Sequence, residues 1–123
     1  MAVRNGAADL QAQLDSLVAQ THANWALVAS DDGSTDDSRA ILQRFAGDQA
    51  ARHPVVVAEG PGRGFVRNFL SLLARPGLSG PVALCDQDDI WFPDRLERAL
   101  ARLAALPPDR PALYCSRRVN WWP

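Results

Sequence analysis

Apolar residues along the chain alternate between short runs and helix-like repeats. The short runs are typical of buried strands, and they occupy 25–30, 54–58, 81–85 and 112–116. Between them, apolar residues three or four positions apart predict helices with one buried face over 8–20, around Ile41–Phe45, over 65–73 and over 93–106. Met1–Val3 reads as the tail of one more strand before an Asn-Gly turn. This alternation predicts an α/β fold, in which a mainly parallel sheet carries helices on its faces.

Two of the predicted strands end in acids. The run 81–85 leads into Asp86, Asp88 and Asp89, and the run 25–30 leads into Asp31 and Asp32. Ligands of open α/β sheets bind at the carboxyl ends of the strands, so we expect Asp32, Asp86 and Asp88 to share one pocket. Clustered carboxylates repel each other unless a cation or hydrogen-bond donors lie between them. Oxygen ligands of this kind suit Mg²⁺ or Mn²⁺ rather than zinc.

Each acid cluster also has a purely structural interpretation. The acids after Cys85 can form a loop that caps the helix beginning near Pro93. Residues 31–37 can form a turn at Gly33 and then a helix cap, with Ser34, Thr35 and Asp36 as the cap-forming residues. A turn and a cap account for 34–37 but not for two acids before the glycine. A calcium loop built on Asp31–Asp37 has only weak support, because the spacing and terminal glutamate of an EF-hand are absent.

A glycine-rich segment, 59–64, separates the run 54–58 from the next helix. It does not match the dinucleotide-binding pattern G-x-G-x-x-G, and a flexible loop is the simpler interpretation. Arg63 and Arg67 are the candidates for chemistry here, because an arginine side chain can bind phosphate in a forked geometry.

Composition narrows the class of protein. The 123 residues predict one domain, 1–123, with one core. The 13 basic residues, all arginine, nearly balance 14 acids, which argues against a nucleic-acid partner. Cys85 and Cys115 lie in apolar runs without metal-type spacing, so we expect reduced core cysteines and a cytoplasmic protein. No run is long enough for a transmembrane segment. Trp121 and Trp122 either pack on the core or mark an interrupted sequence.

Several ordered motifs resemble those of family-two glycosyltransferases of the GT-A fold, and the form CDQDDIW is similar to that of rhamnosyltransferase-like members. The resemblance runs from Asn5 to about Arg117. The motifs that carry it are Gln13–Leu17 with Gln20–His22, Ser30–Asp36, Arg67–Phe69, Cys85–Trp91 and Pro93–Leu96. It implies a Rossmann-like sheet that forms the nucleotide-binding half of the GT-A fold.

The resemblance also implies roles for single residues in binding the nucleotide. Asp32 matches the acid that accepts a hydrogen bond from the N3–H of a pyrimidine base. Asn5 matches the turn beside the nucleotide, although Arg4 stands where the family usually has a tyrosine. Arg63 or Arg67 would lie near the sugar diphosphate.

Asp86 and Asp88 match the D-x-D pair of the family, with Asp88 on the metal and Asp86 on the ribose or the metal shell. The implied cofactor is Mn²⁺ or Mg²⁺, and Asp89 would orient the pair or cap the next helix. The implied reaction is inverting glycosyl transfer from a UDP- or dTDP-linked sugar to a saccharide or lipid-linked acceptor. The implied location of the protein is the cytoplasm, or the inner face of the membrane.

Two departures from the family shape the remaining expectations. Only Met1–Val3 corresponds to a full first strand, and the family continues past Pro123 into the acceptor site. We therefore expect a donor-binding half, truncated at both ends, with no catalytic base in the chain. The alternative is a non-catalytic module that binds a nucleotide and a metal.

Overall fold

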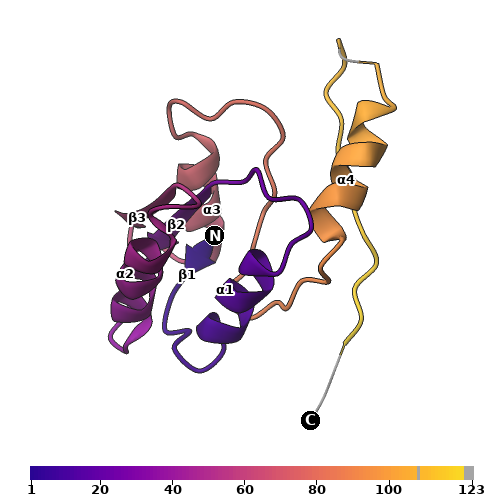
Figure 1. Ribbon diagram of the computed structural model, residues 1–123. Helices are drawn as coiled ribbons and strands as arrows, with labels where there is room; N and C mark the ends of the chain where they lie inside the picture. The colour runs from indigo at the N-terminus through magenta and orange to yellow at the C-terminus, as the bar shows by residue number, and fades with distance from the viewer. Residues whose placement is uncertain (108, 121–123) are drawn as a thin grey trace.

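The computed structural model describes residues 1–107 and 109–120 as a parallel sheet with helices packed around it (Figure 1). The elements in chain order are β1 (Ala2–Val3), α1 (Leu10–Val18), β2 (Leu27–Asp31), α2 (Ser38–Gln49), β3 (Val55–Glu59), α3 (Phe65–Leu73) and α4 (Arg95–Ala104). The strands lie in the order β1-β2-β3, and both pairs are parallel. The predicted α/β architecture is confirmed, and so is the short first strand.

The strand register decides where the loops leave the sheet. Val3 pairs with Asp31, and Asp31 pairs with Glu59, so the three strands end at the same level. Because the strands are parallel, the loops that follow them emerge at one edge. This edge is where the sequence predicts ligand binding.

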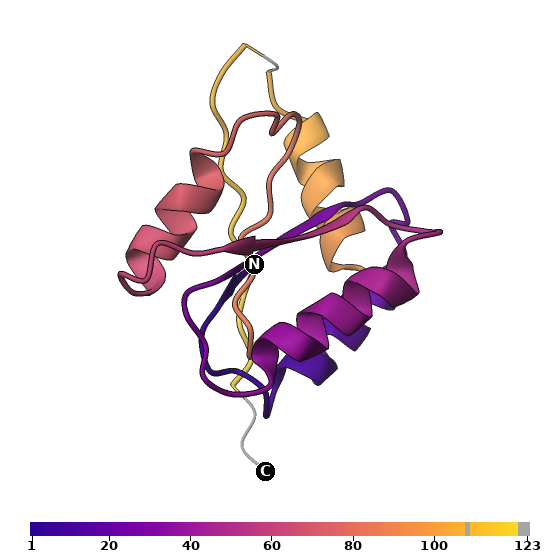
Figure 2. The ribbon, with the colours of Figure 1, turned by 90° about the vertical axis from the view of Figure 1, so that its left-hand side faces the viewer.

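The two faces of the sheet carry different helices. Figure 2 shows the sheet nearly edge on, with α1 and α2 on one side and α3 on the other. Five buried side chains of α1 and α2 form the core with β2, and they are Leu10, Leu14, Leu17, Leu42 and Phe45. On α3, by contrast, the apolar residues Val66, Leu70 and Leu73 are about half exposed.

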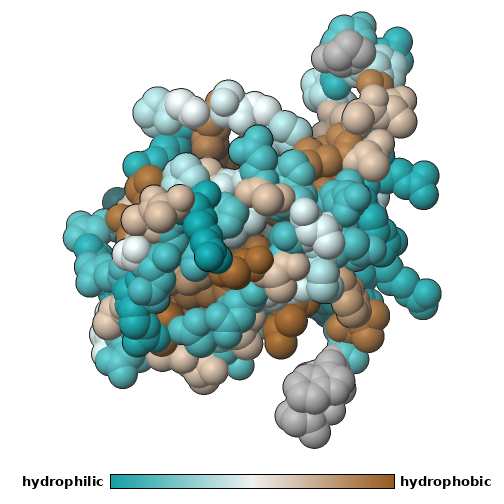
Figure 3. Space-filling model, in the orientation of Figure 1, coloured by the Kyte–Doolittle hydropathy of each residue, from teal (hydrophilic) through white to brown (hydrophobic). Residues whose placement is uncertain are grey.

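The part of the chain around α4 is attached by a few residues only. In Figure 3, α4 and the segment after it stand out from the rest of the surface, and none of the residues of α4 is buried. Trp91 provides the main anchor, since it is buried in the core cluster and its backbone N–H donates to Ser16 Oγ at 3.1 Å. The Arg95 guanidinium lies 4.3 Å from the centre of the Trp91 ring, a cation–π contact.

Two predicted strands are wrong. Residues 81–85 and 112–116 have no regular secondary structure. The first segment reaches the sheet through one backbone hydrogen bond, from Ala2 N–H to Cys85 O at 3.2 Å, and Val82 and Leu84 are about half exposed. In the second, Leu113 is 88% exposed. A strand needs a ladder of hydrogen bonds and an apolar surface to pack on, and these segments have neither.

Two further sequence expectations concern the chain end and membranes. Trp121 and Trp122 lie outside the described residues. Within the part of the chain that the structure describes, no helix combines the length and the apolar character that a membrane crossing requires.

Candidate functional site

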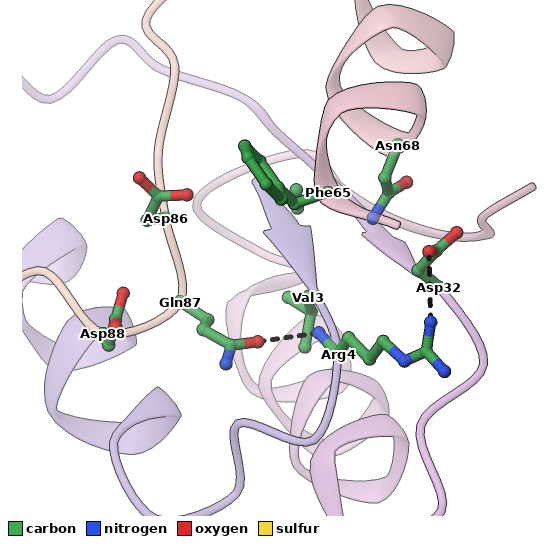
Figure 4. Close-up of a pocket in the computed structure, with 9 residues that line it drawn as sticks. Val3, Arg4, Asp32, Phe65, Asn68, Asp86, Gln87 and Asp88 are labelled. Atoms are coloured by element: carbon green, nitrogen blue, oxygen red, sulfur yellow. Dashed lines mark hydrogen bonds and ion pairs between the residues drawn. The ribbon is translucent and has the colours of Figure 1, made fainter. Parts of the chain in front are cut away.

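A pocket of about 200 Å³ opens at the edge of the sheet where the strands end (Figure 4). Residues from β1 and the turn after it, from the end of β2, from α3 and from the acid segment line the pocket, and they are Ala2, Val3, Arg4, Asp32, Phe65, Asn68, Asp86, Gln87 and Asp88. The structure thus brings together Asp32, Asp86 and Asp88, which lie far apart along the sequence. Residues 81–85 do not form a strand, but Cys85 lies beside β1. Asp86 and Asp88, which follow Cys85, are therefore positioned at this edge of the sheet.

Asp32 is the most buried acid of the pocket, with 2% of its surface exposed. It directly follows β2, and its backbone N–H donates to Val3 O at 2.8 Å. Its Oδ1 accepts a hydrogen bond from Gly62 N–H at 2.7 Å, and its Oδ2 accepts one from Gly64 N–H at 2.7 Å. The Arg4 guanidinium lies 3.9 Å from Oδ2. The carboxylate is therefore held in place by donors on two sides.

Asp86 and Asp88 lie on the opposite wall and are exposed. Partial burial raises the pKa of the Asp86 carboxyl, and the neighbouring carboxylates of Asp89 and Asp88 raise it further. Burial is the larger cause, and the two neighbouring carboxylates add repulsion that a cation would relieve. Among the described residues, however, no three His, Cys, Asp or Glu side chains converge as a ready metal cage. The wall offers carboxylate oxygens but not a complete set of protein ligands.

Asn5 lies outside the pocket and connects two loops. It is exposed, and its φ of 50° is in the left-handed region that asparagine tolerates. Its N–H donates to Ser34 Oγ at 2.9 Å, and its Oδ1 accepts a hydrogen bond from Thr35 N–H at 2.8 Å. Asn5 thereby fixes the turn after β1 against the loop after β2, and this turn places Arg4 in the pocket.

Arg63 and Arg67 are both exposed, and neither lines the pocket. Arg63 lies between the two glycines whose amides bind Asp32, and Arg67 lies on α3 next to Asn68. The structure brings the backbone around them to the site but not their side chains.

Four residues of the pocket had no role in the sequence analysis, namely Arg4, Phe65, Asn68 and Gln87. Asn68 is 1% exposed, and its Nδ2 donates to Ser30 O at 2.9 Å. Its Oδ1 has no hydrogen-bond partner among the described residues. A polar side chain on the apolar face of a predicted helix was the available signal, because position 68 lies one helical turn from Phe65 and Leu72.

Gln87, between Asp86 and Asp88, connects the acid segment to another part of the pocket. Its Oε1 accepts a hydrogen bond from Arg4 N–H at 2.7 Å, which joins the acid segment to the turn after β1 (Figure 4). Gly6 leaves room for this side chain, because a Cβ at position 6 would lie 2.5 Å from Gln87 Cδ. The pattern of apolar residues in the sequence could not predict this contact, because Arg4 and Gln87 lie far apart along the chain.

The helix cap predicted among Ser34, Thr35 and Asp36 is off by at least one residue, because α2 has Asp37 at its N-cap position, without a side-chain capping hydrogen bond. Asp36, the residue before it, binds the first residue of the helix. Its Oδ1 accepts hydrogen bonds from the N–H of Ser38 at 3.0 Å and from Ser38 Oγ at 2.6 Å. The hydrogen bonds from Ser38 Oγ and from Ala7 N–H lower the pKa of Asp36. Asp31 belongs to the preceding turn, since its Oδ1 accepts a hydrogen bond from Ser34 N–H at 3.1 Å. Asp32 alone of the first cluster thus faces the pocket.

Comparison with known proteins agrees with this geometry. Residues 1–118 match the profile described as Glycosyl transferase family 2. An uncharacterized glycosyltransferase of Nostoc sp. is 37% identical over 98 residues, which are 76% of this chain and 28% of that protein.

Two further relatives have more specific names. A dTDP-rhamnosyl transferase of Shigella flexneri is 29% identical over 102 residues, 81% of this chain and 35% of that protein. A UDP-Glc:alpha-D-GlcNAc-diphosphoundecaprenol beta-1,3-glucosyltransferase of Escherichia coli is 29% identical over 94 residues, 76% of this chain and 35% of that protein. The chain spans about a third of the length of such curated relatives. Since the family profile covers nearly all of its residues, the chain belongs to glycosyl transferase family 2.

Proposed function

We propose that this chain binds the nucleoside diphosphate of an activated sugar in the pocket of Asp32, Asp86 and Asp88. The observation that carries the proposal is the meeting of these three carboxylates in one pocket. The names of two relatives, one a dTDP-rhamnosyl and one a UDP-glucosyl transferase, support a UDP- or dTDP-linked donor. Rhamnose is one candidate sugar.

Each residue has a task suited to its position. Asp32 is buried and accepts the N3–H of the uracil or thymine base. Asn5 holds the turn that presents Arg4 to the nucleotide. Arg63 and Arg67 are exposed on the loop and on α3, and they reach the diphosphate from there.

The acid wall fits a divalent metal that is shared with the substrate. Carboxylate oxygens are the ligands that Mg²⁺ and Mn²⁺ prefer, and Asp86 and Asp88 both line the pocket. Asp88 and Asp86 would hold the metal through their carboxylates. A metal held there would supply positive charge that stabilises the departing diphosphate.

The reaction is a single displacement with inversion at the anomeric carbon. The hydroxyl of a saccharide or lipid-linked acceptor attacks this carbon, and the bond to the diphosphate oxygen breaks. The proton of the hydroxyl passes to a general base, a role that we assign to no residue of 1–123. This chain's own residues bind and orient the donor.

Calorimetric titration with UDP and with dTDP, in the presence and absence of Mn²⁺, tests the binding. We expect Mn²⁺ to strengthen binding, and Asp88→Asn to remove about tenfold or more of this gain. Asp48→Asn is the matched control, because it removes the same charge from an exposed residue of α2 that does not line the pocket. Equal titrations for wild type and Asp88→Asn would contradict the metal site.

A second candidate is a module that binds the nucleotide and the metal without catalysis. This candidate is favoured because we assign the role of general base to none of the residues that line the pocket. Incubation of the chain with a nucleotide sugar and Mn²⁺ separates the two candidates. Release of UDP or dTDP above the uncatalysed rate supports the enzyme, and tight binding without release supports the module.

A further inference from the structure

Asp32 has an unusual set of partners for an acid that is proposed to bind a base. Both of its oxygens already accept hydrogen bonds at 2.7 Å, from the amides of Gly62 and Gly64. Hydrogen bonds to an ionised acceptor are roughly twice as strong as neutral ones. The side chain is 1% exposed, so water competes little for these bonds. The strongest contacts of Asp32 are therefore with the loop Gly60–Gly64.

The beginning of this loop packs directly on Asp32. Gly60 N–H donates to Asp31 O at 2.8 Å. A Cβ at position 60 would lie 2.8 Å from Asp32 Cα, 2.8 Å from Asp32 Oδ1 and 2.9 Å from Asn68 Oδ1. Contacts this short are not tolerated, so only glycine fits at position 60. Backbone contact and carboxylate bonds together fasten both ends of the loop.

The same carboxylate also stabilises the start of α3. Gly64 precedes the first residue of this helix, and no side chain of its own segment caps it. Asp32 Oδ2 accepts the N–H of Gly64, while Gly64 O accepts the N–H of Asn68 at 3.0 Å. A negative charge at a helix N-terminus is favourable. A residue at the end of β2 thus caps a helix that begins 33 positions after it in the sequence.

We infer that Asp32 is a positioning residue, which holds the loop Gly60–Gly64 and thereby sets the place of Arg63. Two of the four acceptor positions of the carboxylate bind the loop, and the proposed function assigns a remaining one to the N3–H of the base. Base and diphosphate sites are then coupled through one side chain. This inference rests on the proposed function for the role of Arg63, but the fastening of the loop does not depend on any nucleotide.

Amide hydrogen exchange of the free protein tests the fastening. In the wild type we expect the amides of Gly62 and Gly64 to exchange at least about tenfold more slowly than that of Arg63 between them. Asp32→Asn retains one acceptor oxygen and turns the other into a donor, so exchange at Gly62 or Gly64 rises about tenfold. Equal exchange at all three residues, or no change in Asp32→Asn, would overturn the inference.

Asp31→Asn is the matched control. Asp31 is the preceding residue and is equally buried, but its Oδ1 accepts the N–H of Ser34 at 3.1 Å. Exchange should rise at Ser34 and not in the loop. If both variants accelerate the same amides, the effect is general loosening of β2, and the specific role of Asp32 is refuted.

A second pair of variants decides the matter if Asp32→Asn does not fold. Gly60→Ala places a methyl group against Asp32, and we expect it to displace the loop and speed exchange at Gly62. Gly47→Ala is the control, because a Cβ at this helical position meets nothing within 4 Å. Wild-type exchange in Gly60→Ala would show that the contact does not hold the loop.

Titration with UDP and with uridine separates positioning from contact with the base. If Asp32 places Arg63, Asp32→Asn lowers the affinity for UDP more than that for uridine, by about threefold or more. Equal losses for both ligands would leave only the contact with the base and overturn the coupling. A wild type that binds neither ligand refutes the proposed function, and the exchange experiment still decides the fastening of the loop.

Discussion

The two faces of the sheet have similar helices but different packing. On one face, Leu14 of α1 and Leu42 of α2 are completely buried. On the other, Val66 and Leu70 of α3 are 53% and 52% exposed. The apolar residues of α3 are concentrated on one face more strongly than those of α1 and α2, so the spacing alone does not determine burial. The pocket draws two of its lining residues from α3, the helix on the loosely packed face.

The largest expected difference between the faces concerns two phenylalanines. Phe45 on α2 is 5% exposed, and Phe65 on α3 is 74% exposed. Phe45→Ala should lower the free energy of unfolding by about 3–5 kcal/mol, because it leaves a cavity in the core. Phe65→Ala should change it by less than about 0.5 kcal/mol, as for other surface positions. Urea denaturation measures both, and similar losses would mean that the α3 face is as well packed as the other.

The two cysteines extend the comparison from the well-packed core to the exposed segment after α4. Cys85 belongs to the core on the α1 side, where Gln13 Nε2 lies 2.8 Å from its Sγ, and Cys115 is exposed. Burial raises the pKa of Cys85 to about 11. Since the thiolate is the reactive form, iodoacetamide at pH 8 should label Cys115 at least about a hundredfold faster than Cys85. Peptide mass spectrometry over time gives both rates.

Denaturant provides the control for this experiment. Urea above the unfolding midpoint should make the two labelling rates similar, because burial is the cause of the difference. Fast labelling of Cys85 without denaturant would show that the segment leading to Asp86 opens away from α1.

A smaller difference is expected for two serines. Ser38 at the start of α2 is completely buried, and its Oγ accepts the N–H of Gly6 at 2.8 Å and donates to Asp36. Ser38→Ala leaves the buried N–H of Gly6 without an acceptor, which should cost about 1–3 kcal/mol. Ser71 on α3 donates only to the carbonyl of Asn68 in its own helix. Ser71→Ala should therefore be nearly neutral, and equal costs in thermal denaturation would refute the difference.

The sequence predicted the helices and the central strands well because their signals are local. Apolar spacing located α1 and α3 within a few residues, and the cluster of cap-forming residues marked the start of α2, although the cap position itself falls on Asp37. The expectation that Asp32, Asp86 and Asp88 line one pocket agrees with the structure. The reason differs from the expected one for Asp86 and Asp88, because Cys85 lies beside β1 without forming a strand. The runs 81–85 and 112–116 failed as strands, since an apolar run does not show whether a neighbouring strand is available to pair with it.

The contacts that form the walls of the pocket were harder to predict, because a local pattern does not show which distant segment a residue contacts. Gln87 binds the backbone of Arg4, and Asp32 binds the amides of Gly62 and Gly64. These are single contacts between distant segments, and they leave no period in the sequence. Asn68 was not predicted either, although a polar residue among the apolar positions of a helix is a local signal that could have identified it.

The smallest expected effect is a dependence of stability on pH at Asp36. Hydrogen bonds from Ser38 Oγ and Ala7 N–H lower the pKa of this carboxyl below its model-peptide value of 3.8. A pKa that is lower in the folded than in the unfolded state stabilises the fold above pH 3.8, and this gain is lost as the pH falls through the folded pKa. Asp36→Asn should thus lower the Tm at neutral pH, and the difference from wild type should shrink in acid.

Asp37→Asn controls for the loss of one negative charge next to the same helix, because the Asp37 side chain makes no capping hydrogen bond. Its Tm difference from wild type should stay small across the same pH range. The comparison with Asp36 isolates the hydrogen bonds that join the start of α2 to the loop before α1. If Asp36→Asn and Asp37→Asn follow the same pH curve, general charge rather than these bonds stabilises the well-packed face, and the contrast with α3 must arise from apolar burial alone.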